Sequence, residues 1–259
     1  MSVAGGFDLQ GKVALISGAT GGIGRAMAAQ FAAAGARLVV SSEDSGACAQ
    51  LAGALQAQQV EAIGVAADVT QRDQLEQLVK AANTRFGRID ILCCNAGVVP
   101  HTGPLHTASD QDWKQTMDIN LRSMVWLTSL VVPAMAERGD GAVILTSSLA
   151  GLRGNKGIGL YGIAKAGCAQ LARNLAVEWG PRNVRANALS PGLIDTDFAR
   201  PFKGDEELLR RRLAATPLRR MGRVEEIAGV ALLLAAPAGG FITGQNIVVD
   251  GGTLISDGN

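Results

Sequence analysis

Tyr161, the only tyrosine of this 259-residue chain, stands four residues before Lys165. On an α-helix, which rises about 1.5 Å per residue, positions four apart share a face. A free phenol loses its proton near pH ~10, and a nearby positive charge favours the phenolate. Such a pair is suited to exchange a proton with an alcohol or a ketone. The same spacing also fits a half-buried aromatic residue beside a solvated lysine, so the surrounding elements must decide.

A glycine-rich turn lies between an expected strand and an expected helix. The run Val13–Ile16 is followed by Ser17, then by a segment with the spacing Gly-x-x-x-Gly-x-Gly, and then by a helical pattern. Glycines at such a junction let a pyrophosphate approach the backbone N–H groups at the helix N-terminus. The spacing differs from the more familiar Gly-x-Gly-x-x-Gly. It is therefore the position between strand and helix that predicts a dinucleotide site.

Short apolar runs alternate with longer helical patterns along nearly the whole chain. Nearly continuous apolarity in the short runs indicates a parallel sheet buried on both faces, with helices as crossovers. We expect one domain over residues 1–259, an α/β fold with a Rossmann-like, doubly wound, seven-stranded parallel sheet flanked by helices. The expected strands are Val13–Ile16, Arg37–Val40, Ala62–Ala66, Ile89–Cys93, Ala142–Leu145, Val184–Leu189 and Asn246–Val249. The expected helices cover 23–34, 46–58, 71–86, 110–136, 160–179 and 224–235.

One excursion interrupts this alternation. Between about residues 193 and 223, Pro201 and Pro217 flank a short charged helical pattern at 206–213. A long excursion in a compact domain is often a substrate lid, and Phe198 and Phe202 would be its possible walls. A solvated surface helix is the alternative, and the charge pattern does not decide between the two.

Composition limits the classes of partner. The net charge is +1 with scattered Lys and Arg, which predicts neither nucleic-acid binding nor attraction to an anionic membrane. No charged segment followed by an apolar run opens the sequence and no long apolar run was found, so a cytoplasmic protein is expected. The cysteines have no zinc-ligand spacing. They are expected to be buried free thiols, with no metal and no disulfide: Cys48, Cys93, Cys94 and Cys168.

Several motifs together resemble the short-chain dehydrogenase/reductase family, from about Gly11 to Gly252. The glycine turn resembles its Thr-Gly-x-x-x-Gly-x-Gly motif with Ser17 in place of threonine, and Asn95-Ala96-Gly97 resembles its Asn-Ala-Gly motif. Cys94 stands where asparagine is common, a small departure. The resemblance also covers Asp68-Val69, Asn120, Ser148 thirteen residues before Tyr161, and the segment Pro191, Gly192, Ile194 and Thr196.

The resemblance implies specific roles. Tyr161 would exchange the proton with the substrate oxygen, and Lys165 would hold the ribose and assist Tyr161. Ser148 would bond the substrate oxygen, and Asn120 would hold a water that links Lys165 to solvent. A strand-end hydroxyl and a helix residue that caps a local distortion are the structural alternatives for these two. The implied cofactor-binding residues are Gly18, Thr20, Gly21, Gly22, Ile23, Gly24, Ser42, Glu43, Asp68, Val69, Asn95, Ala96, Gly97, Tyr161, Lys165, Pro191, Gly192, Ile194 and Thr196.

Charge indicates which nicotinamide cofactor is used. A 2′-phosphate needs Arg or Lys, whereas a ribose 2′-OH needs an acceptor such as a carboxylate. After the second expected strand the chain has Ser42, Glu43 and Asp44, with two carboxylates and no cation. NAD is therefore expected over NADP. Ser42 stands where NAD-using relatives often have aspartate, and Arg25 or Arg37 could still bend into the site.

The expected function is an NAD(H)-dependent oxidoreductase that transfers a hydride between the cofactor and a secondary alcohol or ketone. A cyclic alcohol, a hydroxy acid or a sugar derivative would fit, and the substrate stays open. We expect the loop 149–158 to line the substrate pocket. It holds Arg153 and Lys156, which could recognise a carboxylate or phosphate or be solvated. An NADPH-dependent 3-oxoacyl-thioester or carbonyl reductase is the alternative, and a catalytically silent nucleotide-binding protein is the third. By analogy with the family, the helices at 110–136 and 160–179 would form a homotetramer.

Overall fold

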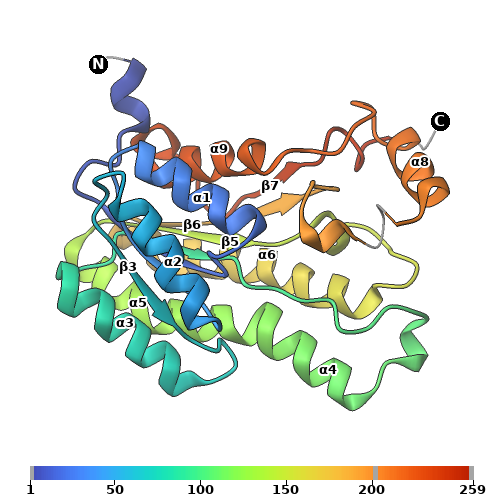
Figure 1. Cartoon of the computed structure of the whole chain (residues 1–259), viewed down its shortest axis with the longest axis horizontal. Coiled ribbons are helices and arrows are strands. Elements are labelled where there is room, and N and C mark those ends of the chain that lie inside the picture. The colour runs from blue at the N-terminus through green and yellow to red at the C-terminus, as the bar shows by residue number, and fades with distance from the viewer. Residues whose placement is uncertain (1–2, 201–203, 257–259) are drawn as a thin grey trace.

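The computed structural model describes residues 3–200 and 204–256 and confirms the predicted sheet. Seven parallel strands follow the order β3-β2-β1-β4-β5-β6-β7 (Figure 1). The order reverses between β1 and β4, so this is a doubly wound sheet, and ligands bind such sheets beyond the carboxyl ends of the strands. The strands are β1 Val13–Ser17, β2 Arg37–Ser42, β3 Ala62–Ala66, β4 Ile91–Cys94, β5 Gly141–Thr146, β6 Val184–Pro191 and β7 Asn246–Val249.

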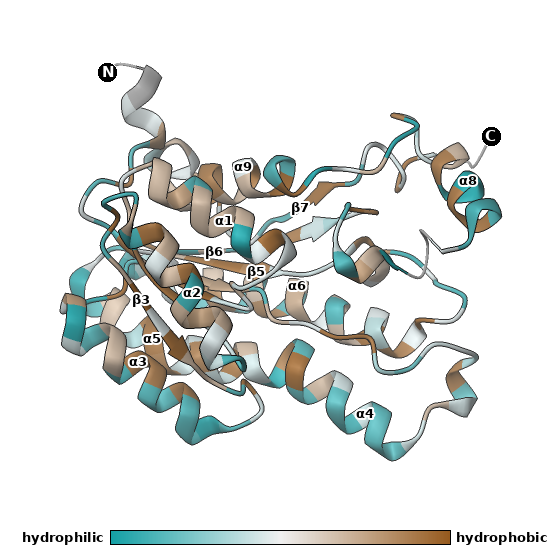
Figure 2. Cartoon of the chain, viewed as in Figure 1, coloured by the Kyte–Doolittle hydropathy of each residue, from teal (hydrophilic) through white to brown (hydrophobic). Residues whose placement is uncertain are grey.

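Helices cover both faces of the sheet. One buried cluster joins α3, α5 and α6 to one face, and a second joins α1, α2 and α9 to the other. The two helical layers lie on either side of the sheet in Figure 1, and α3 turns hydrophilic residues outward in Figure 2. The helices are α1 Gly22–Ala33, α2 Ser45–Gln56, α3 Arg72–Phe86, α4 Asp110–Met117, α5 Ser123–Arg138, α6 Gly159–Trp179, α8 Glu206–Ala214 and α9 Val224–Ala235.

Full burial explains why the central strands could be predicted from the sequence. Every residue of β1, β4 and β5 is buried, as expected for strands covered by helices on both faces. β4 begins at Ile91 rather than at the predicted Ile89, and just before it the Asp90 carboxylate accepts a hydrogen bond from the Val13 backbone N–H at 2.9 Å. The strands thus form a rigid base whose carboxyl ends carry the motif residues.

The prediction of one continuous helix over 110–136 is wrong at its centre. A π-helical turn, Asp118–Arg122, separates α4 from α5. Within it the Asn120 side chain donates to the carbonyls of Thr116 and Val98, both at 2.9 Å, and accepts from the Val98 N–H at 3.1 Å. π-Turns inside helices occur frequently at functional sites.

The stretch Asp110–Arg138 is long and apolar enough to cross a membrane by length and composition alone. Half of its most apolar window is buried inside the protein, and α5 packs on the sheet and on α3 and α6. A core helix of a folded domain passes the same test, so the burial accounts for its apolar composition.

The excursion after β6 leaves the sheet and returns to it. Its ends are joined by backbone hydrogen bonds, from Gly222 N–H to Leu193 O at 3.0 Å and from Asp195 N–H to Gly222 O at 2.9 Å. Between them lies α8, at one end of the molecule (Figure 1). Phe202, one of the two predicted lid walls, lies outside the described residues.

Candidate active site

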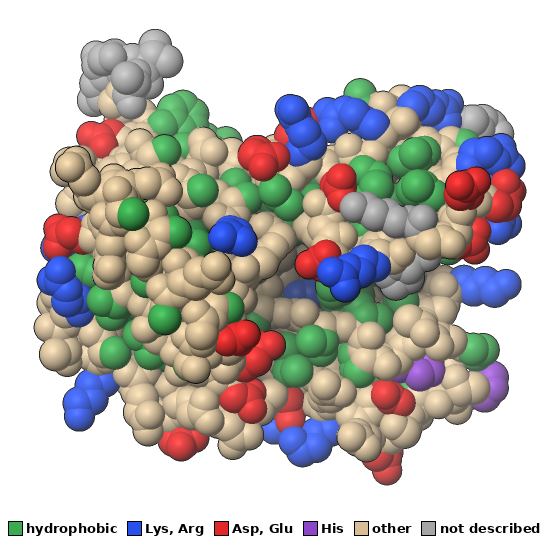
Figure 3. Space-filling view, viewed as in Figure 1, with side chains coloured by type: hydrophobic (Ala, Val, Ile, Leu, Met, Phe, Trp, Pro, Cys, Tyr) green, Lys and Arg blue, Asp and Glu red, His purple; other side chains and the backbone are tan. Residues whose placement is uncertain are grey.

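A cavity of about 660 Å³ lies at the carboxyl ends of the strands. The face drawn in Figure 3 is hollowed near its middle, between the body of the molecule and the part that carries α8. The predicted residues that line this cavity are Gly18, Thr20, Gly21, Gly22, Ile23, Ser42, Glu43, Asp68, Val69, Asn95, Ala96, Gly97, Ser148, Tyr161, Lys165, Pro191, Gly192, Ile194 and Thr196. Residues from all parts of the sequence therefore meet at one edge of the sheet.

Two predicted residues, Gly24 and Asn120, do not line the cavity. Gly24 lies in the first turn of α1, where a Cβ would be 2.1 Å from the Gly18 carbonyl oxygen. Gly18 itself has φ +62°, and a Cβ there would lie 2.8 Å from the Ala96 backbone. These glycines let β1, α1 and the segment after β4 approach one another closely, so they shape the turn from behind.

The N-terminus of α1 is suited to an anion. Gly21 is the N-cap, it provides no side-chain cap, and the first turn contains no acidic residue. The first N–H groups of a helix have no partner within it, and the helix dipole places partial positive charge there. Gly21, Gly22 and Ile23 line the cavity at this point. The donor set fits the pyrophosphate of a dinucleotide.

Acceptor groups follow β2 and β3. Glu43 is exposed and lines the cavity beside Ser42, whose backbone N–H donates to Cys48 Sγ at 3.1 Å. The Asp68 carboxylate accepts from the N–H and the hydroxyl of Thr70, both at 2.8 Å. A carboxylate at the end of β2 fits a ribose hydroxyl better than a 2′-phosphate.

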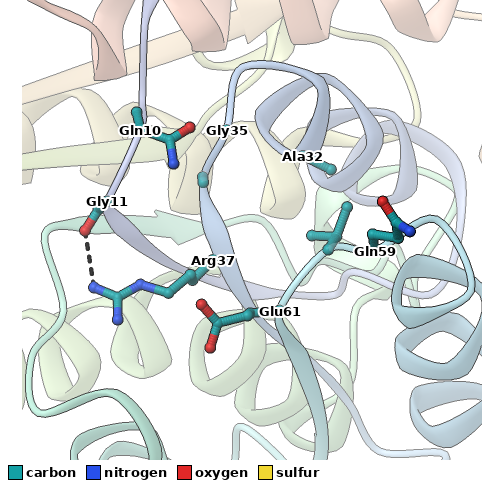
Figure 4. Close-up of a pocket in the computed structure, with 9 residues that line it drawn as sticks. Gln10, Gly11, Ala32, Gly35, Arg37, Gln59 and Glu61 are labelled. Carbon is teal, nitrogen blue, oxygen red and sulfur yellow. Dashed lines mark hydrogen bonds between the residues drawn. The ribbon is translucent and has the colours of Figure 1, made fainter.

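The arginines that could have bent into this end of the cavity do not line it. Arg37 begins β2 and lies in a separate cavity of about 460 Å³, where it donates to the Gly11 carbonyl at 2.9 Å (Figure 4). Arg37 is the first residue of β2 and Ser42 is the last, so Arg37 and Glu43 lie at opposite ends of this strand. Arg25 is exposed on α1. Among residues 3–200 and 204–256, the cations lining the larger cavity are Lys165, Arg153 and Arg212.

Tyr161 and Lys165 lie together on the first turns of α6, as their spacing predicts. Lys165 is 2% exposed and donates from Nζ to the Thr146 carbonyl oxygen at 2.7 Å. Its Nζ is 5.5 Å from the centroid of the Tyr161 ring. Tyr161 is 9% exposed, and the Phe198 ring lies 5.9 Å from its ring, centroid to centroid. Of the two predicted aromatic walls, Phe198 therefore contacts the candidate catalytic residue.

Ser148 follows β5 and caps a short 3₁₀ turn, Leu149–Gly151, by accepting from the Ala150 N–H at 3.1 Å. The hydroxyl still lines the cavity with Tyr161 and Lys165. Its neighbour Ser147 donates from its hydroxyl to the Lys165 carbonyl at 2.7 Å, which fastens α6 to the end of β5. The three polar groups of the predicted catalytic set are thus held by the end of one strand and the start of one helix.

Asn120 lies behind the cavity wall and is fully buried. A Cβ on Gly97 would be 2.9 Å from its Oδ1 and 3.4 Å from Lys165 Nζ, so the three residues adjoin. Its backbone carbonyl oxygen accepts from Cys168 Sγ at 3.1 Å. Its Nδ2 donates to the carbonyls of Val98 and Thr116, so the side chain joins the π-turn to the segment after β4.

The cysteines are buried free thiols, as predicted. Burial raises the pKa values of the Cys93 and Cys94 thiols. It also raises the pKa of Cys168, although the positive charge of Lys165 acts in the opposite direction. Among the described residues, no group of three or more His, Cys, Asp or Glu side chains could hold a metal ion.

Some residues that line the cavity were not predicted individually from the sequence. Arg212 shares the less exposed face of α8 with Leu208 and Leu209, four and three residues earlier, and this spacing was a signal that its side chain faces inward. Of the two loop cations, Arg153 lines the cavity and Lys156 is exposed and does not. The predicted pocket loop 149–158 supplies Leu149, Ala150, Asn155 and Ile158 to the wall, and the predicted lid supplies Leu193, Asp197, Ala199, Arg212 and Thr216. The lining residues outside any predicted segment or motif are Val98, Gln115, Ile119, Thr146, Ser147 and Thr253.

Comparisons with known proteins agree with this arrangement. The family model described as enoyl-(acyl carrier protein) reductase matches residues 18–253. The human dehydrogenase/reductase SDR family member 4 is 37% identical over 245 residues, which cover 95% of this chain and 88% of that protein.

Solved structures are similar over almost the whole chain. A putative gluconate dehydrogenase from Agrobacterium tumefaciens has 33% identity and a TM-score of 0.93, with 96% of this chain and 98% of that one covered. A gluconate 5-dehydrogenase from Burkholderia cenocepacia, in complex with NADP and tartrate, has 31% identity and a TM-score of 0.93, with 98% and 99% covered. With the glycine turn, the Tyr161–Lys165 pair and Ser148 on one cavity, these matches show that the chain belongs to the short-chain dehydrogenase/reductase family.

Proposed function

We propose that this protein is an NAD(H)-dependent dehydrogenase that interconverts a secondary alcohol and its ketone in the cavity described above. The observation that carries the proposal is that Ser148, Tyr161 and Lys165 line the same cavity as the glycine turn and Glu43. A dinucleotide whose pyrophosphate is held at the turn could therefore place its nicotinamide beside a substrate held at Tyr161. Membership of the oxidoreductase family supports the same reading.

The chain's own residues supply the proton chemistry. In the oxidation, the Tyr161 phenolate takes the proton from the substrate hydroxyl, and in the reduction the phenol returns it to the carbonyl oxygen. The buried ammonium of Lys165 lies beside the Tyr161 ring, and the Ser148 hydroxyl donates to the substrate oxygen. The bound nicotinamide supplies the chemistry of accepting or donating the hydride.

Asn120 acts in this proposal through its backbone. Its side chain fixes the π-turn to Val98, which keeps the carbonyl oxygen within hydrogen-bond distance of Cys168. A water on that carbonyl would connect Lys165 with solvent. Asn120 is therefore a positioning residue, and its amide does not contact the substrate.

NAD is the proposed cofactor because the end of the cavity beyond β2 is acidic. Glu43 would accept a hydrogen bond from a ribose hydroxyl and would repel a 2′-phosphate. Two of the similar solved structures contain NADP, and the matching family model is described as an enoyl-(acyl carrier protein) reductase, so an NADPH-dependent carbonyl or 3-oxoacyl-thioester reductase is the second candidate. A silent nucleotide-binding protein is the third, and the joint presence of Ser148, Tyr161 and Lys165 on the wall disfavours it.

The excursion from Leu193 onward is proposed as the substrate lid. Ile194, Phe198, Arg212 and Thr216 contribute to the cavity wall from the described parts of this excursion. Closure over bound substrate would exclude water from the reacting atoms.

A homotetramer is proposed from the outer faces of α4, α5 and α6. Trp113, Val125, Ile163 and Val177 expose apolar surface on these helices. Large apolar patches on a protein surface often mark sites of contact with another protein. Size-exclusion chromatography with light scattering tests this, and a Val125→Glu/Ile163→Glu variant should dissociate while the wild-type protein should have four times the monomer mass.

The test of the proposed function begins with a titration by NADH and NADPH, followed through energy transfer from the three tryptophans. A panel of secondary alcohols is then assayed with the oxidised form of the tighter cofactor. Tighter NADH binding with alcohol oxidation supports the proposal. Tighter NADPH binding with ketone reduction favours the second candidate, and NADH binding without turnover of any alcohol or ketone favours the third.

A further inference from the structure

Two arginines from different segments meet at one end of the cavity. Arg153 lies in the loop between the 3₁₀ turn Leu149–Gly151 and α6, and Arg212 lies on α8. Both line the cavity, and both are half-buried. Neither is needed for the proton transfer assigned to Tyr161.

A chain of contacts connects the two arginines through the wall. Arg153 Nη1 donates to the Thr253 carbonyl at 3.3 Å, and the hydroxyls of Thr253 and Thr216 are 3.0 Å apart. The Thr216 hydroxyl in turn donates to the Arg212 carbonyl at 3.0 Å. The loop, the excursion and the segment after β7 are thus joined around one end of the cavity.

This end is remote from the nucleotide groups. The glycine turn, Glu43 and Asp68 follow β1, β2 and β3, which form one half of the sheet. Arg153, Arg212 and Thr253 follow β5, β6 and β7, which form the other half. Tyr161 and Ser148 also follow β5, so the arginines belong to the substrate side.

The two positive charges act on each other. Burial lowers the pKa of the Arg212 guanidinium, and the positive charge of Arg153 lowers it further. The carboxylate of Asp197, which lines the same side, is in an ion pair with Arg200, with Arg200 Nη2 at 2.9 Å from Asp197 Oδ1. Two half-buried like charges are unfavourable together, and an anion placed between them relieves this repulsion.

The surroundings reinforce the positive potential. Between Glu206 and Arg223 the chain has more arginines than acidic residues, although the whole chain is almost neutral. A positively charged rim beside a cleft raises the local concentration of anions and their rate of entry. Guanidinium groups bind carboxylate and phosphate through two parallel hydrogen bonds.

We propose that the substrate carries an anionic oxygen group, a carboxylate or a phosphate, which Arg153 and Arg212 bind while Tyr161 and Ser148 hold the reacting alcohol or ketone. This inference rests on the proposed function and deepens it, because it names the substrate class. Arg212 belongs to α8, so binding of the anion also draws the excursion onto the substrate. The contacts of Thr216 and Thr253 hold the two arginines in fixed positions relative to each other.

The experiment compares charged and neutral members of matched pairs. Acetoacetate, 4-oxopentanoate and 5-oxohexanoate place the carboxylate at increasing distance from the ketone, and the methyl ester of each removes the charge. Dihydroxyacetone phosphate beside dihydroxyacetone provides a phosphate pair. Initial rates are measured with the cofactor that binds more tightly, for the wild-type protein and for Arg153→Gln, Arg212→Gln and the double variant.

Two variants serve as matched controls. Arg211→Gln removes a neighbouring guanidinium of α8 that pairs with Glu207, and Lys156→Gln removes an exposed cation of the Arg153 loop. Neither residue lines the cavity. They report any effect of net charge or of surface substitution on the rate.

One member of the charged set should have a higher kcat/KM than its neutral partner. Arg153→Gln or Arg212→Gln should reduce kcat/KM for that member by about 10- to 100-fold, mainly through KM, because a charge-assisted hydrogen bond is lost. The rates with the neutral partner and with both control variants should change less than about threefold. The preference between carboxylate and phosphate identifies the group.

Equal kcat/KM for every charged and neutral pair would overturn the inference, and so would losses of the same size for both members in the arginine variants. A binding measurement that does not require turnover distinguishes failure of the anion site from failure of the proposed function. Quenching of bound-cofactor emission by the oxo acids, but not by the esters, and its loss in Arg212→Gln would support the anion site even without reduction. Reduction of esters and acids alike, with no effect of Arg212→Gln, would retain the dehydrogenase and reject the anion site.

Discussion

Lys165 donates a hydrogen bond from Nζ to the carbonyl oxygen of Thr146, the last residue of β5, at 2.7 Å. This bond fixes the ammonium group at the end of the strand, with Nζ 5.5 Å from the centroid of the Tyr161 ring. The start of α6 and the end of β5 are therefore joined at the point where the substrate oxygen would lie. The electrostatic role of Lys165 depends on this fixed position rather than on a mobile side chain.

Replacement of this ammonium tests its role. Lys165→Met keeps a side chain of similar length in a buried site and removes the positive charge. General acid–base catalysis contributes about 10²- to 10⁴-fold, so kcat for alcohol oxidation should fall by about 10²-fold or more.

The measurement is kcat for alcohol oxidation by the wild-type protein and by Lys165→Met. Lys156→Met is the matched control, because Lys156 is exposed and does not line the cavity. A kcat of Lys165→Met equal to that of the control would contradict the proposed role of Lys165.

Glu43 tests the cofactor assignment. Glu43→Arg replaces the acceptor beyond β2 with a group that can bind a 2′-phosphate. The ratio of the dissociation constants for NADPH and NADH should shift towards NADPH by about 10- to 100-fold, the value of a charge-assisted hydrogen bond gained and a repulsion lost.

Fluorescence titration of both cofactors measures this ratio. Glu137→Arg makes the same charge change on exposed surface at the end of α5 and should leave the ratio as in the wild type. If the two variants give the same ratio of NADPH and NADH dissociation constants, Glu43 does not bind the ribose.

Glu226 provides a pH test of how the excursion is attached. Its carboxylate pairs with Arg220 at 2.6 and 2.8 Å and accepts from the Arg223 N–H at 2.8 Å. The hydrogen bonds from Arg220 come first among the causes that lower the pKa of Glu226 to about 2. A lowered pKa in the folded state means that the stabilisation is present above the unfolded value of 4.5 and is lost as the pH falls towards 2.

Urea unfolding of wild type and Glu226→Gln should therefore differ at pH 7 and converge between pH 4.5 and the lowest pH at which the protein remains folded. Glu225→Gln, one residue earlier on α9, is the matched control. A difference for Glu226→Gln that stays constant from pH 7 to pH 3 would show that the carboxylate charge is not its cause.

The strands were the most predictable part of this fold. Val13–Ser17 and Ile91–Cys94 are buried along their whole length, and this burial is why their sequences are almost continuously apolar. The glycine turn and the Tyr161–Lys165 pair were also predictable, because strand–turn–helix order and helical spacing are local features.

The break at Asn120 could not be read from the sequence. The helical pattern continues through 110–136, and the bonds that stabilise the π-turn reach Val98, which is 22 residues away. The position of Arg37 was open for a similar reason: only the strand register places it beside Gly11 and away from Glu43. Contacts between distant segments decide such points.

Arg212 is an intermediate case. Its spacing from Leu208 and Leu209 indicates an inward face of α8, but the place of α8 over the cavity depends on the return of the excursion at Gly222. Local pattern predicts which way a helical residue faces, whereas tertiary contacts determine what it meets.

Tyr161→Phe is the most direct test of the account. The variant removes one hydroxyl and keeps the ring that lies 5.9 Å from Phe198, so the wall and the nucleotide end should be unchanged. NADH binding and turnover of the best alcohol are measured on the same preparation. Turnover should fall by about 10³-fold or more, while the NADH dissociation constant should stay within about threefold of wild type. Near-normal turnover in Tyr161→Phe would contradict this expectation, because the proton would then pass through another group.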